Sequence, residues 1–238
     1  MQITTGKKRA IAAGALLSAA AVLGASVVSS SDAAQAPSAG PDTHAQLTPL
    51  NNSGVTGSAD VTVDGRRLEV HLDARHLLKG MPHAEHIHFG AQARHECPSV
   101  RDDANSDHRL NTAEGLPAYG PVKVSLTTRG DTSDKSTLAV KRYPMAEKGQ
   151  IHYNRKGIVV SERVARGIRN GKAVLVIHGI DYNHNGKYDF SAGRSELDPS
   201  LPAEATDPVT CGVLQVVSSS PASSTPSPTS PTLPLSEE

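Results

Sequence analysis

The residues of this 238-residue chain best suited to chemistry are histidines in a short alternating pattern. His86 and His88 flank Ile87, and in a β-strand residues two apart project from the same face. The two imidazoles would then lie side by side as a pair of metal ligands. His178 ends the apolar run 174–177 and could supply a third nitrogen from a neighbouring strand. Imidazole suits copper, zinc, iron and nickel, so ligand type alone does not select the metal. The alternative is a strand that simply exposes two histidines.

Residues 103–114 match the pattern of a twelve-residue calcium loop. Oxygen-bearing side chains stand at positions 1, 3, 5 and 9, and a glutamate able to bind bidentately stands at position 12. His108 occupies position 6, where glycine normally makes the sharp turn. The pattern is therefore equally typical of a solvated polar loop. The expected ligands are Asp103, Asn105, Asp107, Asn111 and Glu114.

A second polar loop at residues 181–189 begins in the same way and keeps its glycine, Gly186. Position 12 is Ala192, so the bidentate carboxylate is absent unless Glu196 folds back to replace it. An Asn-Gly turn is therefore favoured over a calcium site. The weaker set of calcium ligands would be Asp181, Asn183, Asn185 and Asp189.

The two ends of the chain differ from its middle. Residues 1–36 combine a basic start, an uncharged stretch at 10–28 and a small-residue cleavage pattern at 34–36, which indicates a secretory signal peptide; a retained membrane anchor is the alternative. Residues 37–46 are expected to be a flexible segment. Residues 47–217 are expected to form one domain. Residues 218–238 form a Ser/Pro/Thr-rich tail, expected to be disordered and typical of a stalk at a cell wall or surface.

Composition narrows the possible partners and the compartment. The chain has 24 basic and 24 acidic residues and no basic block, so nucleic acid is not an expected partner. We expect a secreted or extracytoplasmic protein. In an exported chain, the two cysteines Cys97 and Cys211 predict one disulfide bond.

Period-two alternation predicts an all-β domain. Apolar residues alternate over 59–63 and 68–72 on either side of Asp64-Gly65, which predicts a hairpin with a tight turn. Further short strands are expected at 85–89, 121–128, 173–178 and 213–217, and another hairpin joins 137–143 to 150–154. Residues 159–168 form the one expected helix. Many short strands with turns between them favour a sandwich or barrel.

Four motifs in order resemble the Cu/Zn superoxide dismutases over most of residues 50–216. They are a hairpin and glycine-rich turn leading to His83-x-x-His86-x-His88, a half-cystine at Cys97, the strand ending at His178, and the closing run Thr-Cys-Gly-Val-Leu at 210–214. The resemblance implies a Greek-key β-barrel with long loops and one disulfide.

The same resemblance implies a site and an activity. His86, His88 and His178 would be copper ligands, and His83 would be a structural histidine that hydrogen-bonds nearby. The Cys97–Cys211 bond would tie the metal-loop region to the barrel. The implied chemistry is copper-dependent dismutation of superoxide.

The chain departs from this family at several positions. Asp103 stands where the family has its bridging histidine, and neither His95 nor His108 is in register. The zinc cluster is not visible in residues 111–121, so zinc is not expected. Pro208 replaces the active-site arginine, and no motif supports Arg194 as a substitute. Copper binding remains the expected function, whereas fast dismutation does not follow.

Residues 115–133 resemble a second group, bacterial exported proteins with the CHRD (chordin-type) domain, which are related to the dismutase barrel and mostly have no assigned activity. This resemblance implies the alternative function, a non-catalytic extracytoplasmic binding or structural module stiffened by calcium. A copper storage or delivery protein would share the histidine site but release its copper. The sequence sets no oligomeric state.

Overall fold

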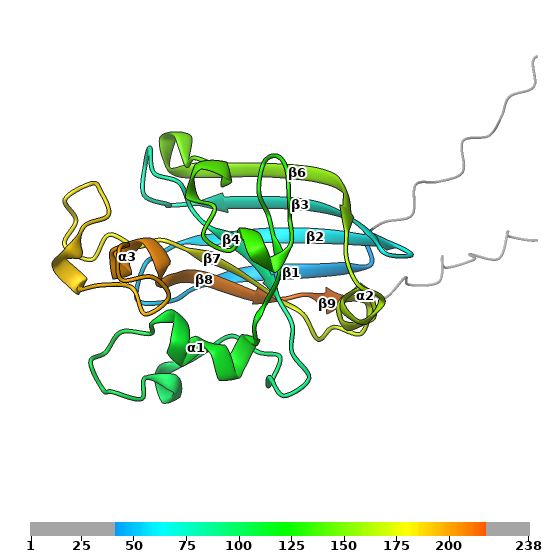
Figure 1. The fold of residues 1–238 in the computed structure, drawn as a ribbon, viewed down its shortest axis with the longest axis horizontal. Helices are drawn as coiled ribbons and strands as arrows, with labels where there is room; N and C mark the ends of the chain where they lie inside the picture. Colours follow the sequence, from blue (N-terminus) through cyan, green and yellow to red (C-terminus); the bar gives the residue numbers. More distant parts are fainter. Residues whose placement is uncertain (1–40, 218–238) are drawn as a thin grey trace, which may run out of the picture. The chain divides into compact units, whose positions relative to one another are not determined.

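The computed structural model describes residues 41–217, which form a nine-stranded antiparallel sheet with short helices in its connections (Figure 1). The strands are β1 (Thr43–Pro49), β2 (Thr56–Asp64), β3 (Arg67–Arg75), β4 (Glu85–His88), β5 (Val122–Ser125), β6 (Gln150–Val159), β7 (Val174–His178), β8 (Pro208–Val213) and β9 (Gln215–Val216). The α-helices are α1 (Thr112–Tyr119), α2 (Glu162–Arg169) and α3 (Ala203–Thr206). The expected signal peptide and tail lie outside the described residues.

The strand order is β5-β4-β7-β8-β1-β2-β3-β6, and β9 pairs with β1. The sheet curls into a half-barrel around an aliphatic core, which confirms the expected all-β fold. The predicted hairpin is β2–β3, where Val61 lies opposite Val70. Gly65 in its turn has φ of +55°, a conformation that glycine adopts without strain. Within residues 41–217, no helix has the length and apolar character that crossing a membrane requires.

Strands β4 and β7 are buried on both faces, and these two strands carry the histidines of the candidate site. Ile87, Leu175 and Ile177 point into the main core of the half-barrel. Because side chains alternate along a strand, His86 and His88 point to the opposite face. On that face the long loops of the domain cover the sheet, so every residue of β4 and β7 is buried.

The two cysteines form the predicted disulfide, Cys97–Cys211, with 5.7 Å between their Cα atoms. Cys211 lies on β8, and the bond joins this strand to the segment that leads into α1. Tyr119 of α1 packs with Val174 and Val176 of β7 in a second, smaller apolar cluster. The disulfide thus holds the α1 segment over the outer face of β7 and β8 (Figure 1). It is compatible with an extracytoplasmic protein.

Two expectations about strands are wrong. Residues 137–143 do not pair with 150–154; they lie among 3₁₀ turns at Asp134–Ser136 and Val140–Arg142. Strand β6 pairs instead with β3 along its whole length. Residues 43–46, expected as part of a flexible segment, form the first half of β1, where Ala45 and Leu47 are buried. Two apolar residues are too short an alternation to indicate a strand by themselves.

The expected helix over 159–168 is displaced towards the C-terminus. Val159 still belongs to β6, and α2 begins only after Ser161, whose side chain accepts the backbone N–H of Val164. Helix α1 was not expected because Pro117 lies inside it. Its start is fixed by Asn111 and Glu114, which form a reciprocal capping box.

Candidate metal centre

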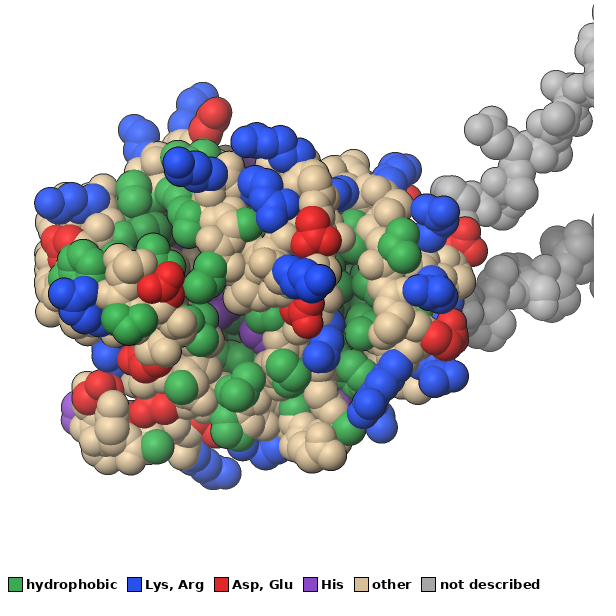
Figure 2. Space-filling view, in the orientation of Figure 1, with side chains coloured by type: hydrophobic (Ala, Val, Ile, Leu, Met, Phe, Trp, Pro, Cys, Tyr) green, Lys and Arg blue, Asp and Glu red, His purple; other side chains and the backbone are tan. Residues whose placement is uncertain are grey.

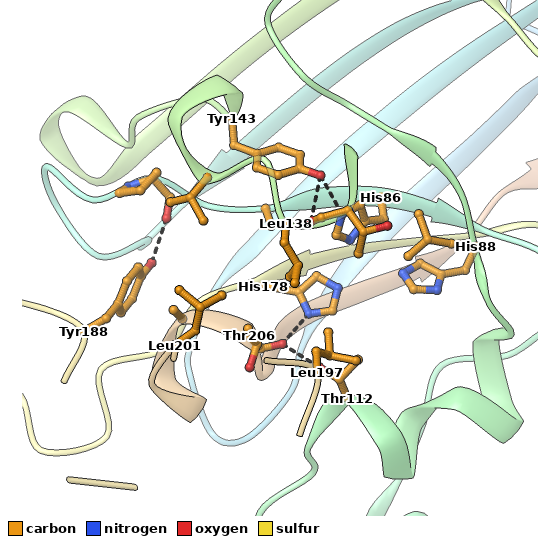
Figure 3. A pocket seen from close by; sticks show the side chains of 16 residues that line it. His86, His88, Thr112, Leu138, Tyr143, His178, Tyr188, Leu197, Leu201 and Thr206 are labelled. Carbon is orange, nitrogen blue, oxygen red and sulfur yellow. Dashed lines mark hydrogen bonds between the residues drawn. The ribbon is translucent and has the colours of Figure 1, made fainter. Parts of the chain in front are cut away.

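Three histidines from two neighbouring strands meet on the loop-covered face of the sheet. In the β4–β7 register, His86 lies opposite Val176, so His178 lies one position further along on the same face. The three side chains are at most 3% exposed. One ring nitrogen of each lies within 4.8 Å of the others (Figure 3). The structure therefore brings together the three residues that the sequence pattern singled out.

Backbone carbonyls fix the tautomers of two of these rings. Nδ1 of His88 lies 2.7 Å from the carbonyl oxygen of Gly120. Nδ1 of His178 lies 2.7 Å from the carbonyl oxygen of Thr206. Because a carbonyl only accepts hydrogen bonds, each Nδ1 carries the proton and each Nε2 keeps a bare lone pair.

A tyrosine fixes the third ring in the opposite sense. Nε2 of His86 lies 2.7 Å from the hydroxyl oxygen of Tyr143. That hydroxyl donates its own proton to the carbonyl oxygen of Ser136, at 2.8 Å. Nε2 of His86 must therefore be the donor, and Nδ1 keeps the bare lone pair.

The three bare nitrogens are Nδ1 of His86, Nε2 of His88 and Nε2 of His178. All three are buried and find no hydrogen-bond partner within the described part of the chain. An unpaired buried acceptor costs about 1–3 kcal/mol. A metal ion bonded to all three nitrogens would offset that cost. The donor set therefore fits a metal ion, and its chemistry does not name the element.

Burial keeps these imidazoles neutral. Burial is the main cause that lowers the pKa of His88 to about 3 and that of His178 to about 4. The pKa of His86 also falls well below its ordinary value, first by burial and then by repulsion from the other two rings. Neutral imidazole is the form that binds metals, so no proton needs to leave at neutral pH.

Tyr143 orients the ligand His86 through a hydrogen bond. Replacing Tyr143 by phenylalanine removes the nearer acceptor of Nε2 of His86 and leaves only the carbonyl oxygen of Thr137, at 3.3 Å, so the ring is held less firmly. We expect metal affinity to fall about tenfold, at the low end for the loss of an outer hydrogen bond to a ligand. Isothermal titration with copper measures the change. Tyr153→Phe is the matched control, since its buried hydroxyl bonds to the carbonyl of Thr127 in the main core. Equal affinity in the two variants would contradict the assigned role.

The disulfide-linked segment holds His88 from its other side. The ring of Tyr119 packs against the His88 ring with 4.4 Å between centroids. Gly115 permits this packing because a Cβ there would lie 2.4 Å from the Tyr119 ring. The carbonyl of Gly120 then follows directly in the chain to accept from His88. Sequence analysis missed these residues because their contribution comes from packing and backbone.

A cavity of about 50 Å³ lies over the three rings. Its lining is mostly apolar, and Leu138, Val140, Leu197 and Leu201 stand around it (Figure 3). Figure 2 shows histidine atoms between hydrophobic side chains in a hollow of this face. The three imidazoles thus have a mostly apolar space above them in which a further ligand could bind.

Four residues that the sequence comparison placed at or near dismutase positions do not line this cavity: Asp103, His95, His108 and Arg194. The carboxylate of Asp103 accepts the backbone N–H groups of its own loop. His95 stacks on Phe89, with 5.7 Å between the rings, and His108 is exposed. Arg194 donates to the carbonyl of Pro199. None of these side chains lines the cavity, and within the part of the chain that the structure describes its lining holds no fourth histidine and no arginine.

His83 lies beside the site and outside the converging group. It is fully buried, and its Nδ1 donates to the carbonyl oxygen of His178 at 3.0 Å. The hydroxyl of Tyr188 lies 3.2 Å from its ring nitrogens. His83 thus hydrogen-bonds to the end of the strand that carries His178, and its role beside a metal stays a prediction.

The first predicted calcium loop is closed by its own hydrogen bonds. Glu114 does not stand apart as a ligand: one carboxylate oxygen accepts from the backbone of Ala104 and the other from Asn111. Asn105 and Asp107 bond to each other across the loop. The loop needs no ion to satisfy these groups, and calcium binding here stays a prediction.

In the second loop the predicted side chains also gather. The amide groups of Asn183 and Asn185 donate to the carboxylate of Asp189. Glu196 does not fold back; it is exposed, and buried Glu204 of α3 lies beneath the loop instead. The Glu204 carboxylate accepts from the backbone of Asp189 at 2.7 Å. Sequence spacing missed Glu204 because it lies 15 residues beyond Asp189.

Asp207, next to the carbonyl that orients His178, gives the domain a pH dependence. Burial raises its pKa to about 7, although Arg109 and the hydroxyl of Tyr182 oppose the shift and Glu196 and Asp107 add to it. The folded state therefore holds a proton that the unfolded state has lost above about pH 4. This group's contribution to the free energy of unfolding is full below pH 4 and declines as the pH rises to 7.

We expect Asp207→Asn to remove this decline. Between pH 4 and pH 7, the free energy of unfolding of the wild type should fall by roughly 1–4 kcal/mol more than that of the variant. Urea unfolding at several pH values measures it, and the slope rather than the absolute stability is the readout. Parallel curves for the two proteins would show that Asp207 ionises normally.

No protein-family model and no curated protein matches this sequence. The case for a function therefore rests on the geometry of the three-histidine site and on the order of its motifs.

Proposed function

We propose that this chain is an exported copper-binding protein with a barrel of the Cu/Zn superoxide dismutase type. The observation that supports it is the convergence of three bare imidazole nitrogens whose tautomers are fixed from outside. Each of the three rings has one nitrogen bound to a carbonyl or phenol oxygen and the other aimed at a common point. Such outer hydrogen bonds are the usual support of histidine ligands.

Copper is the metal we favour. The site has three neutral nitrogens and no carboxylate or thiolate that would direct it to another ion. Among divalent first-row metals, nitrogen sites bind copper most tightly, and this preference decides where geometry imposes none. Bound copper would supply one-electron redox chemistry. The residues of this chain hold it, keep its ligands oriented and cover it with apolar side chains.

Superoxide dismutation is the less supported part of the proposal. A fast reaction with an anion needs positive charge near the metal. Pro208 stands at the position of the family's arginine and is buried in β8. Among residues 41–217, no lysine or arginine lines the cavity. Copper binding with slow or no dismutation is therefore the function we put forward.

Copper analysis of the purified protein tests the proposal. Protein loaded with copper and freed of excess should retain one equivalent. Its electron paramagnetic resonance spectrum in the oxidised state should show coupling to three nitrogens. Retention well below one equivalent, or a spectrum without nitrogen coupling, would refute copper binding at this site. A dismutase assay on the same sample then separates binding from catalysis.

The second candidate is a non-catalytic extracytoplasmic module of the CHRD type, stiffened by calcium. It is favoured by the gathered polar side chains of the 181–189 loop over buried Glu204. Calcium added to chelator-treated protein should then raise the melting temperature by a few degrees. The rise should shrink in Asp181→Asn and persist in His86→Ala. An unchanged melting temperature would remove this candidate.

A further inference from the structure

The cavity above the three histidines is lined mostly by apolar side chains, whereas an entrance that attracts anions carries positive charge. Sixteen residues line it, and none of them is aspartate, glutamate, lysine or arginine. Leu138, Val140 and Leu197 are each at least 39% exposed, so apolar side chains form its rim. A ligand on its way to the histidines therefore crosses hydrophobic surface.

The hydroxyl groups in the lining are already committed to hydrogen bonds with the protein. Each hydroxyl donates to a backbone carbonyl or to a serine of its own loop, at 2.6–3.2 Å. None has to turn into the cavity to find a partner. These hydroxyls belong to Thr112, Thr137, Tyr143, Tyr188 and Thr206.

An anion in this space would lose its hydration, and apart from the bound metal ion it would gain neither a positive side chain nor a free hydrogen-bond donor. Moving a charge into such surroundings costs several kcal/mol unless it is paired. A small uncharged molecule pays no such cost. The volume of about 50 Å³ admits only a few heavy atoms, since one water needs about 10–15 Å³ measured in the same way.

We propose that this cavity selects small uncharged ligands, of the size of a diatomic gas, over anions for binding at the three-histidine metal. The inference rests on the proposed copper site and adds the class of molecule that reaches it. The specificity residues are the apolar side chains of the rim, Leu138 first, because it is partly exposed and lines the cavity together with His86 and His178 (Figure 3).

Two probes of similar size and different charge test the inference on copper-loaded protein. Carbon monoxide is added to the reduced protein and followed by its C–O stretching band. Azide is added to the oxidised protein and followed by its charge-transfer absorption. We expect one carbon monoxide per copper and only weak azide binding. Tight azide binding, or no carbon monoxide binding, would overturn the inference.

Leu138→Lys places a cation at the rim, where the partial exposure of residue 138 lets the ammonium group stay hydrated. Azide affinity should rise about tenfold, the effect of a unit charge a few ångströms away under partial screening. Carbon monoxide binding should not change. Val159→Lys makes the same substitution on β6, at a side chain 58% exposed and outside the cavity lining, and should leave azide binding as in wild type.

Copper content measured before either probe is added separates the two claims. Less than one equivalent in wild type would refute the proposed copper site, and the ligand preference with it. One equivalent of copper with equal azide affinity in wild type and Leu138→Lys would overturn the ligand preference alone.

Discussion

His86→Ala is expected to lower copper affinity at least about a hundredfold. The change removes one of three nitrogen ligands. If the binding free energy resembles the 10–16 kcal/mol of small structural zinc sites, each ligand contributes about 3–5 kcal/mol. The substitution also removes the Nε2–H group of His86 that donates a hydrogen bond to the hydroxyl of Tyr143. Competition titration against a chelator of known copper affinity measures the loss.

A matched histidine variant makes this result specific. His152 lies on β6 with a side chain 76% exposed, paired with Asp73. His152→Ala should keep full copper affinity. Copper should also raise the melting temperature of wild type and of this control but not of His86→Ala, because only bound metal stabilises the folded state. Equal affinity in both variants would place the copper elsewhere.

Removing the disulfide is expected to have the largest effect on stability. The double variant Cys97→Ser, Cys211→Ser frees a loop closed over 114 positions. For a loop of about 100 residues, the chain-entropy model gives a loss of roughly 4–5 kcal/mol in the free energy of unfolding. Urea unfolding measures it. A loss under about 1 kcal/mol would show that the α1 segment holds its place without the bond.

The same variant should weaken copper binding. The segment after Cys97 carries Tyr119 and Gly120, which pack against His88 and accept its Nδ1 proton. A looser segment leaves this ring less fixed, and the expected loss of affinity is about tenfold, as for other outer contacts of a ligand. If the variant does not fold, the disulfide of the metal-free wild type is reduced, both thiols are alkylated and the reductant is removed before copper is added, so that neither reductant nor free thiol competes for the metal.

Sequence reasoning found what depends on local pattern. Alternation in β2, β3 and β4 has a period of two, so it predicted the hairpin and the shared face of His86 and His88. The disulfide followed from two cysteines in a chain expected to be exported. These features need only neighbouring residues or a count.

Sequence reasoning could not find what depends on backbone groups far away in the chain. The carbonyls of Gly120 and Thr206 select the nitrogen that each ligand presents, and any residue type has a carbonyl. Residues 137–143 were expected as a strand, yet they contain the 3₁₀ turn Val140–Arg142, directly after which Tyr143 reaches His86. In that segment, tertiary contacts with the site override the local preference.

Diffraction from a copper-loaded crystal, recorded at the copper absorption edge, would locate the metal ion and the atoms bonded to it. The anomalous signal should give one copper bonded to Nδ1 of His86 and to Nε2 of His88 and His178. Bond lengths should be about 2.0–2.1 Å, close to those of zinc–nitrogen bonds. Copper bound through the opposite nitrogen of any of these rings, or at a site without them, would contradict the account.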